Sequence, residues 1–267
     1  MTAIEPTTVG LIGFGTLARQ LVAALPDRTD GPIVRWIALL REGSTAAIPS
    51  DITVVRRLED MVATQPCVVV EAAGQESVAA CVPALLRSGI SVIVASVGAL
   101  ADETTAAAIA EARRQSGARL VMSSGAIGGL DYLAAVAGLA DTRVVYRLKK
   151  PVAAWRAELG ALGLAETMQA VTLFEGTPAE AARLYPKNLN AAFTAMLAVQ
   201  PARITVSVVA DPGVAANIHE IDVESAAGTA SFRFANTPSY DNPKTSAVTA
   251  LSLAAAVRNF LDKGAKA

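Results

Sequence analysis

The sequence lacks a charge excess of either sign. Among its 267 residues, 23 basic side chains stand against 24 acidic ones, and the formal net charge is −1. Binding to a polyanion or to an anionic lipid surface normally relies on a field of one sign, so neither nucleic acid nor a membrane surface is an expected partner. No apolar stretch approaches the roughly 20 residues that span a bilayer. The sequence therefore predicts a soluble globular protein.

Cysteine and histidine are also scarce. The chain contains two cysteines, Cys67 and Cys81, and one histidine, His219. Two dispersed cysteines and a single histidine do not form the usual ligand sets for a metal ion, so no metal site is expected. The first ten residues, MTAIEPTTVG, lack the basic and apolar regions of a secretory signal. A cytoplasmic location is the simplest expectation.

The first half of the chain alternates short β-branched runs with longer helical patterns. Apolar residues make up 52% of the sequence, which is ample for a buried core. This alternation is typical of β-α-β units and predicts an α/β fold, a Rossmann-type doubly wound parallel sheet. Strands are expected at 8–13, 33–40, 67–73, 91–96 and 118–123, and helices at 16–25, 76–88 and 103–116.

The pattern changes near residue 142. The segments 142–150, 170–175, 202–210, 217–225 and 229–236 alternate apolar with polar residues, which is typical of an antiparallel sheet with one covered face. A last helix is expected from Lys244 to Asp262. We therefore predict a dinucleotide-binding domain over 1–125, completed by a C-terminal helix within 241–267. A second, α+β domain for substrate binding and dimerisation is expected over 126–240.

A glycine turn follows the first expected strand. In GLIGFGTLA, Gly13, Gly15 and Ala18 have the G-x-G-x-x-A spacing that opens a helix, with Thr16 and Leu17 in its first turn. The first glycine allows the tight turn, the second lets a pyrophosphate approach the backbone, and the alanine lets the helix pack closely on the sheet. The spacing favours dinucleotide binding over a purely structural turn.

The end of the second expected strand bears on the choice between NAD and NADP. An acid here commonly binds the ribose hydroxyls of NAD, whereas an arginine can accommodate the 2′-phosphate of NADP. The chain has Leu40 at this point, followed by Arg41, Glu42 and, two residues on, Ser44. Arg41 with Ser44 could hold a phosphate and Glu42 could serve NAD, while Arg41 could equally be a solvated loop cation.

The single histidine lies in the segment NIHEIDVES. In an alternating strand, His219 shares a face with Asn217 and Ile221, whereas Glu220 and Asp222 point to the other face. His219 is therefore expected to face the interior or a cleft. Imidazole has an unperturbed pKa near 6.5 and suits proton transfer at neutral pH, but a packed or a surface histidine would also fit this pattern.

Three further clusters combine glycine, asparagine and lysine. They are SSGAIGGLDYL (123–133), YPKNLNAA (185–192) and DNPKTS (241–246). Taken singly, they are explained by a glycine turn, a helix cap and a proline-led helix start.

Taken together, these motifs resemble the L-aspartate dehydrogenase family over about residues 8–260. The resemblance rests on VGLIGFGTLA, SGAIGGLD, LFEGTPAEAARLYPKNLNAA, VVADPGVAANIHEI and DNPKTSAVTALSL, in the family's order. It implies a Rossmann-type domain, a substrate domain with a mixed sheet, and a homodimer. It also implies the oxidative deamination of L-aspartate with NAD or NADP. The product, iminoaspartate, can hydrolyse to oxaloacetate and ammonia or enter NAD biosynthesis.

The resemblance also assigns residues. His219 matches the family's catalytic histidine, while Ala126 and Asn190 match positions that contact the nicotinamide cofactor. With this match, His219 is expected to be the general acid/base, and Asn217 to orient either His219 or the substrate. The chain departs from many relatives at LLREG, where they have an acid before the arginine. The departure leaves the choice between NAD and NADP open.

The two carboxylates of L-aspartate require cations or backbone donors. The candidates are Lys187, Asn188, Lys244, Thr245 and the N–H groups of the GAIGG turn. Lys244 and Thr245 are expected at the start of the last helix, where an anion is favoured. Two other readings remain. One is a two-domain reductase of the dihydrodipicolinate reductase or homoserine dehydrogenase type, and the other is a non-catalytic dinucleotide sensor.

Overall fold

The computed structural model describes residues 6–25, 33–185, 189–240 and 242–264. The chain divides into two compact units, one formed by Met1–Ser123 with Ala250–Ala267 and the other by Ser124–Thr249. The strands of the first unit are β1 (Thr7–Ile12), β2 (Val34–Leu39), β3 (Thr53–Val55), β4 (Val68–Glu71), β5 (Ser91–Val94) and β6 (Leu120–Met122). Its helices are α1 (Thr16–Ala23), α2 (Leu58–Ala63), α3 (Gln75–Arg87), α4 (Glu103–Ser116) and most of α9 (Val248–Gly264), with a 3-10 turn η1 (Val97–Ala101).

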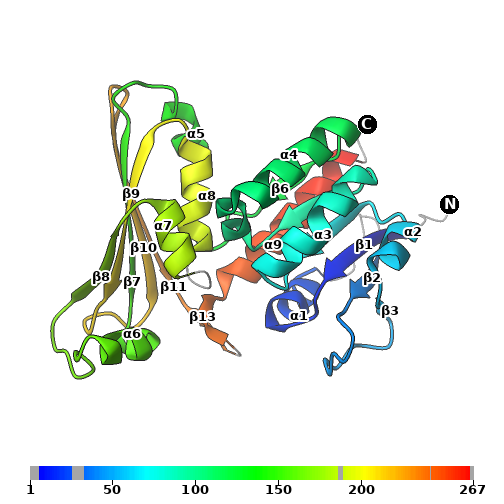
Figure 1. Ribbon diagram of the computed structural model, residues 1–267, viewed down its shortest axis with the longest axis horizontal. Helices are drawn as coiled ribbons and strands as arrows, with labels where there is room; N and C mark the ends of the chain where they lie inside the picture. The colour runs from blue at the N-terminus through cyan, green and yellow to red at the C-terminus, as the bar shows by residue number, and fades with distance from the viewer. Residues whose placement is uncertain (1–5, 26–32, 186–188, 241, 265–267) are drawn as a thin grey trace. The chain divides into compact units, whose positions relative to one another are not determined.

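The first unit is a doubly wound α/β structure, as predicted (Figure 1). Within the described residues its strands form one sheet in the order β3-β2-β1-β4-β5-β6, and every pair is parallel. The strand order reverses between β1 and β4, where this class of sheet binds its ligands beyond the carboxyl ends of the strands. Val68, Val69 and Val70 of β4 have no exposed surface, because helices cover both faces of the sheet.

The helices of the first unit lie on the two faces that right-handed connections dictate. Leu21 of α1 packs with Leu253 and Val257 of α9 in one core, together with alternate side chains of β1 and β2. On the opposite face, a Cβ at Gly10 would lie 2.9 Å from the Met61 sulfur of α2. Glycine at this position therefore lets α2 pack directly on β1.

Glu71 connects the carboxyl ends of two strands at the point of reversal. It is the last residue of β4 and has no exposed surface. Its carboxylate accepts hydrogen bonds from the backbone N–H groups of Ala73 and Gly74, at 2.9 and 2.7 Å. It also accepts from the N–H and the hydroxyl of Ser96, which follows β5, at 2.9 and 3.1 Å. These bonds fix the loop that packs against the glycine turn.

The second unit is a mixed sheet covered by helices. Its strands are β7 (Arg143–Lys150), β8 (Val171–Gly176), β9 (Arg203–Ala210), β10 (Asn217–Ser225), β11 (Gly228–Asn236), β12 (Pro238–Ser239) and β13 (Asn242–Ser246). Its helices are α5 (Leu130–Val136), α6 (Arg156–Ala161), α7 (Pro178–Leu184) and α8 (Asn190–Val199), with a 3-10 turn η2 (Val152–Trp155). The larger sheet has the order β11-β10-β7-β9-β8. The β7 and β9 strands are parallel, whereas the other pairs of this sheet are antiparallel. The mixed sheet implied by the family resemblance is therefore confirmed, and the antiparallel sheet expected from alternation was wrong for this one pair.

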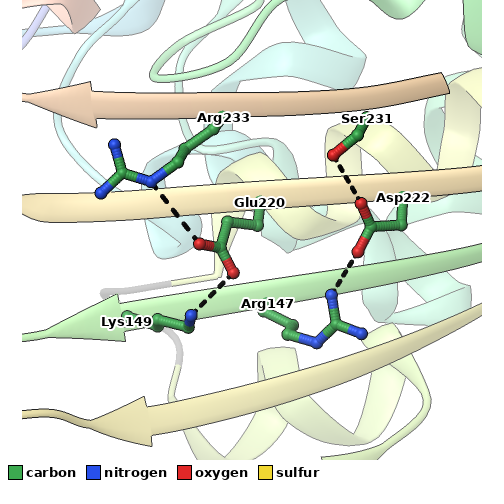
Figure 2. Close-up of polar contacts among 6 residues, drawn as sticks. All are labelled: Arg147, Lys149, Glu220, Asp222, Ser231 and Arg233. Carbon is green, nitrogen blue, oxygen red and sulfur yellow. Dashed lines mark hydrogen bonds and ion pairs between the residues drawn. The ribbon is translucent and has the colours of Figure 1, made fainter.

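The two faces of this sheet differ in chemistry. Figure 1 shows α5, α7 and α8 along one face, which carries the buried side chains of β7 and β10. The other face carries two clusters of ion pairs (Figure 2). In the first, the Glu220 carboxylate lies 2.8 Å from the Lys149 ammonium and 3.6 Å from the Arg233 guanidinium. In the second, the Asp222 carboxylate pairs with Arg147 and accepts a hydrogen bond from Ser231. Strand alternation thus separates a dry face from a charged one.

The predicted start of the last helix was wrong. Residues Asn242–Ser246 form β13, which pairs antiparallel with β12, and α9 begins only at Val248. The N–H of Ala247 donates to the carbonyl of Thr237 at 2.9 Å and closes this ribbon. Lys244 and Thr245 therefore lie on a strand, so the argument that a helix start favours an anion beside them no longer applies. Strand pairing here outweighs the proline signal.

We predict that Glu71→Gln lowers the free energy of unfolding by about 1–3 kcal/mol, because an amide N–H₂ would replace one of two buried acceptor oxygens. Urea unfolding at neutral pH measures this change. The matched control is Glu111→Gln on α4, where the carboxylate is 45% exposed, and a change within about 0.5 kcal/mol is expected. Equal effects of the two substitutions would contradict the structural role of Glu71.

Candidate active site

The glycine turn between β1 and α1 combines a tight contact with an open one. Gly13 has φ +80°, and a Cβ there would lie 2.8 Å from the Cβ of Ala73 in the loop that Glu71 holds. Gly15 is different, because a Cβ there would meet nothing within 4 Å. Only Gly13 is required by the protein's own packing. The space at Gly15 fits the close approach of a pyrophosphate to the backbone.

The amino end of α1 has the features of an anion site. Gly15 is its N-cap residue, has no side chain to cap the helix, and is followed by a first turn without acidic residues. Thr16 accepts a hydrogen bond from the Arg19 guanidinium at 3.2 Å, and Ala18 is fully buried. Free N–H groups and the positive dipole end at this position favour a phosphate. The residues present therefore fit a dinucleotide.

The loop after β2 carries the exposed side chain of Arg41. Leu40, which replaces the usual acid, is only 3% exposed, whereas Arg41 and Glu42 are exposed. The guanidinium of Arg56, which follows β3, donates to the carbonyl of Arg41 at 3.0 Å. A second arginine thus lies beside the first. Arg56 was not among the predicted residues, because its place beside Arg41 depends on the pairing of β3 with β2, and β3 was not predicted.

The glycine turn of the second unit packs against aromatic rings. A Cβ at Gly129 would lie 3.0 Å from the ring of Phe232, and one at Gly128 would lie 3.3 Å from the ring of Phe234. Packing against these rings explains why both positions are glycine, and the predicted role of the N–H groups of this turn in binding a carboxylate stays a prediction. The carbonyl of Ala126 accepts a hydrogen bond from the Asn236 side chain at 2.7 Å, so its peptide is held in one orientation.

His219 lies in the covered face of the mixed sheet. It is the third residue of β10, pairs with Leu148 of β7 and is 4% exposed. The inward direction predicted from alternation is therefore confirmed. Its Nδ1 lies 2.6 Å from the hydroxyl of Tyr146, a β7 residue with no exposed surface. The sequence analysis proposed Asn217 as the orienting residue and missed Tyr146.

Burial sets the protonation states of this pair. Desolvation, with a smaller contribution from the positive charge of Lys150, lowers the pKa of His219 to about 3. Desolvation also raises the pKa of Tyr146, so its hydroxyl stays protonated. At neutral pH the imidazole is therefore uncharged and has a lone pair that can accept a proton, while the same burial disfavours the imidazolium form.

The same face carries two further polar groups. Tyr146, Leu148 and Lys150 alternate along β7, and Lys150 is 3% exposed. The Lys150 ammonium lies 5.8 Å from the ring centroid of Trp155 on η2. The Trp155 ring is 1% exposed and packs edge-on against Tyr185, with centroids 5.4 Å apart. No prediction from sequence included Lys150 or Trp155.

The remaining predicted residues lie in several elements. Asn190 is the first residue of α8, and Asn217 is the buried first residue of β10. Thr245 lies on β13 and is partly buried. Lys187, Asn188 and the side chain of Lys244 lie outside the described residues.

Comparison with known proteins identifies the family. An L-aspartate dehydrogenase of Bordetella bronchiseptica is 41% identical over 258 residues, which cover 95% of this chain and 96% of that protein. The chain belongs to the L-aspartate dehydrogenase family. Family descriptions match in two parts: residues 13–123 match "Homoserine dehydrogenase, NAD binding domain", and residues 131–260 match "Aspartate dehydrogenase, C-terminal".

Solved structures agree with this membership. The aspartate dehydrogenase of Thermotoga maritima matches with a TM-score of 0.74 and 27% identity, over 96% of this chain and 97% of that one. A dihydrodipicolinate reductase from Paenisporosarcina sp. has a TM-score of 0.54 at 12% identity, over 97% of this chain and 96% of that one. The second likeness shows a common fold alone.

In the described part of the chain, no three His, Cys, Asp or Glu side chains are grouped so that they could hold a metal ion. No helix within the same part is long and apolar enough to cross a membrane.

We predict that substitutions at the two glycines of the dinucleotide turn affect different properties, protein stability at Gly13 and cofactor binding at Gly15. Gly13→Ala should lower the free energy of unfolding by about 2 kcal/mol, because it adds a 2.8 Å contact at positive φ. Gly15→Ala should leave stability within about 0.5 kcal/mol and weaken cofactor binding about tenfold or more, because the methyl group enters the open space. Urea unfolding and a fluorescence titration with NADH and NADPH measure the two effects, and a reversed pattern would contradict the assignment.

We also predict a pH dependence of stability from His219. Its folded pKa of about 3 lies below the unfolded value near 6.5, so the unfolded chain binds the extra proton. The free energy of unfolding should therefore not depend on His219 above pH 6.5. It should fall as the pH is lowered from 6.5 to 5, by up to about 1.4 kcal/mol per pH unit. Urea unfolding of wild type and His219→Gln over this range provides the test. The variant should lack this slope, and equal slopes would show that His219 is not buried uncharged.

Proposed function

We propose that the chain oxidises L-aspartate to iminoaspartate with NAD or NADP and, in reverse, aminates oxaloacetate with ammonia. Membership of the L-aspartate dehydrogenase family, from 41% identity over nearly the whole chain, is the observation that carries this function. The dinucleotide turn at Gly13 and Gly15 and the buried imidazole of His219 support it, because the reaction needs a nucleotide site and a proton acceptor.

His219 acts as the general acid/base in this account. When its Nδ1–H donates to the oxygen of Tyr146, the lone pair of Nε2 is left to accept a proton from the substrate amine. Nδ1 then keeps the same hydrogen bond in both protonation states, so the ring need not turn during proton transfer. Tyr146 is thus a positioning residue that fixes the orientation of the ring through the nitrogen that does not meet the substrate.

The pyrophosphate of the cofactor is assigned to the glycine turn of the first unit. When bound, NAD or NADP supplies the acceptor for the hydride that leaves Cα of the substrate as its C=N bond forms. Thr16 and Leu17 begin the helix whose N–H groups bind the pyrophosphate, and Arg41 is placed to meet a 2′-phosphate. Ala126 and Asn190 are the expected contacts to the nicotinamide. The homodimer and the cytoplasmic location stay predictions.

One assay separates this function from its rivals. Purified protein is given NAD or NADP with L-aspartate, and NADH or NADPH with oxaloacetate and ammonia. Turnover with both pairs is expected. Turnover only with another carbonyl or imine would indicate a different reductase of this fold. Cofactor binding without turnover on any substrate would indicate a dinucleotide sensor.

We predict that His219→Asn lowers kcat for L-aspartate by about 10²- to 10⁴-fold, the usual effect of losing a general acid/base. Cofactor affinity should change little. Tyr146→Phe should lower kcat about tenfold, because the ring remains and only the hydrogen bond to Nδ1 is lost. Steady-state kinetics and a cofactor titration provide the measurements. An unimpaired His219→Asn enzyme would overturn the assignment of the histidine.

We predict that Arg41→Ala weakens the binding of NADP at least about tenfold and changes that of NAD less than about twofold, since only NADP carries the 2′-phosphate. Arg56→Ala should have the same direction with a smaller effect. The dissociation constants of both cofactors give the answer, with Arg113→Ala on α4 as a control at an exposed arginine. Equal losses for NAD and NADP would exclude a phosphate contact.

A further inference from the structure

We infer that Lys150 and Trp155 form a subsite that binds one carboxylate of the substrate beside His219. This inference rests on the proposed function and extends it, because it names side chains that would select a dicarboxylic amino acid. Lys150 supplies a positive charge and Trp155 an indole N–H donor. Neither residue was among the candidates drawn from the sequence.

The first observation is the position of Lys150. It is the last residue of β7, and its side chain lies on the same buried face of the strand as those of Tyr146 and Leu148. Leu148 is the β7 residue that pairs with His219. Lys150 is 3% exposed, so its positive charge lies in surroundings where charged side chains are rare. In such surroundings a carboxylate is attracted far more strongly than it is by a lysine in water.

The second observation is a buried donor without a partner. Among the described residues, the indole Nε1 of Trp155 has no hydrogen-bond partner, although the side chain is only 1% exposed. A buried N–H left in this way destabilises the folded protein, and each such group calls for an explanation. A ligand oxygen would satisfy it.

The third observation is that the two groups are neighbours. The Lys150 ammonium lies over the Trp155 ring, 5.8 Å from its centroid, so a ligand that binds the ammonium at the edge of this ring is near the indole N–H as well. A carboxylate suits this pair because it has two oxygens, one for each donor, and a negative charge to meet the ammonium.

The fourth observation connects the pair to the acid/base. Lys150 lies two residues beyond Leu148, which pairs with His219, on the same buried face of β7, and its charge adds to the effect of burial in lowering the pKa of His219. A carboxylate bound at Lys150 therefore lies near the imidazole and places the rest of the amino acid within its surroundings. The aromatic rings of Trp155, Tyr185 and Phe174, which pack edge-on in series, keep this end of the sheet apolar and strengthen the attraction.

The kinetic test compares two adjacent lysines. Lys150→Met should lower kcat/KM for L-aspartate by about 10²-fold, mostly through KM, and leave the cofactor dissociation constant unchanged. Lys149→Met is the matched control, because Lys149 lies on the opposite face of the same strand in an ion pair with Glu220 (Figure 2). It should change kcat/KM less than about threefold. Trp155→Phe, which keeps a ring and removes the N–H, should raise KM about tenfold.

A binding test works without turnover. The chain has two tryptophans, so ¹⁵N-labelled protein gives two indole signals, and the Trp155→Phe variant assigns them. Succinate, a dicarboxylate that cannot be oxidised as an amine, is titrated in the presence of saturating NAD. The Trp155 signal should shift, that of Trp36 should not, and Lys150→Met should weaken succinate binding about 10²-fold.

The outcomes separate the two proposals. If wild type does not oxidise L-aspartate, the proposed function fails, and the succinate titration still decides whether the subsite exists. If wild type oxidises L-aspartate while Trp155→Phe retains its KM and succinate leaves the Trp155 signal unmoved, the function stands and the subsite is overturned. The Trp155 variant also decides the question if Lys150→Met does not fold.

Discussion

The hydrogen bond between Tyr146 and His219 depends on a dry sheet face, and the chemistry proposed for this protein depends on that bond. The two atoms are 2.6 Å apart and both side chains are almost fully buried. Without water, the imidazole stays uncharged and the phenol stays protonated. A nitrogen fixed in this way can exchange a proton at its other side without moving. The fold must therefore keep water from this face and keep the two strands in register.

The architecture meets both needs through strand alternation. Residues of β7 and β10 point alternately to the helices and to the charged face, where Glu220 and Asp222 are held by Lys149 and Arg147. Those ion pairs bridge the same two strands that carry Tyr146 and His219. A shift in register by one residue would turn the imidazole outward. The ion pairs on the charged face and the buried side chains on the other face thus specify a single register of β7 and β10.

The two glycines of the dinucleotide turn in the first unit have different roles. Gly13 is constrained by the protein, through Ala73 and the loop held by Glu71, whereas Gly15 faces open space. The buried carboxylate of Glu71 is satisfied entirely by donors from the ends of β4 and β5. The turn is therefore rigid before any ligand arrives, which reduces the entropy lost on binding.

Local patterns were enough to predict the parts of this fold that depend on local spacing. The G-x-G-x-x-A spacing predicted the turn between β1 and α1, and alternation predicted the direction of His219. Tyr146 and Lys150 were missed because their proximity to His219 depends on which strands pair, and β7 lies 73 residues from β10 along the chain at this contact. Lys150 did leave a signal, since alternation in YRLKK puts a lysine on the apolar face. The helix start at Lys244 failed because pairing with β12 is a tertiary effect.

The protonation of His219 in the folded protein tests the central claim most directly. The chain has one histidine, so its ring protons give one set of proton NMR signals that can be followed from pH 8 to pH 5. A buried, uncharged imidazole bound to Tyr146 predicts signals that do not titrate over this range. A titration with an ordinary midpoint near pH 6.5 would show a solvated imidazole and contradict the account.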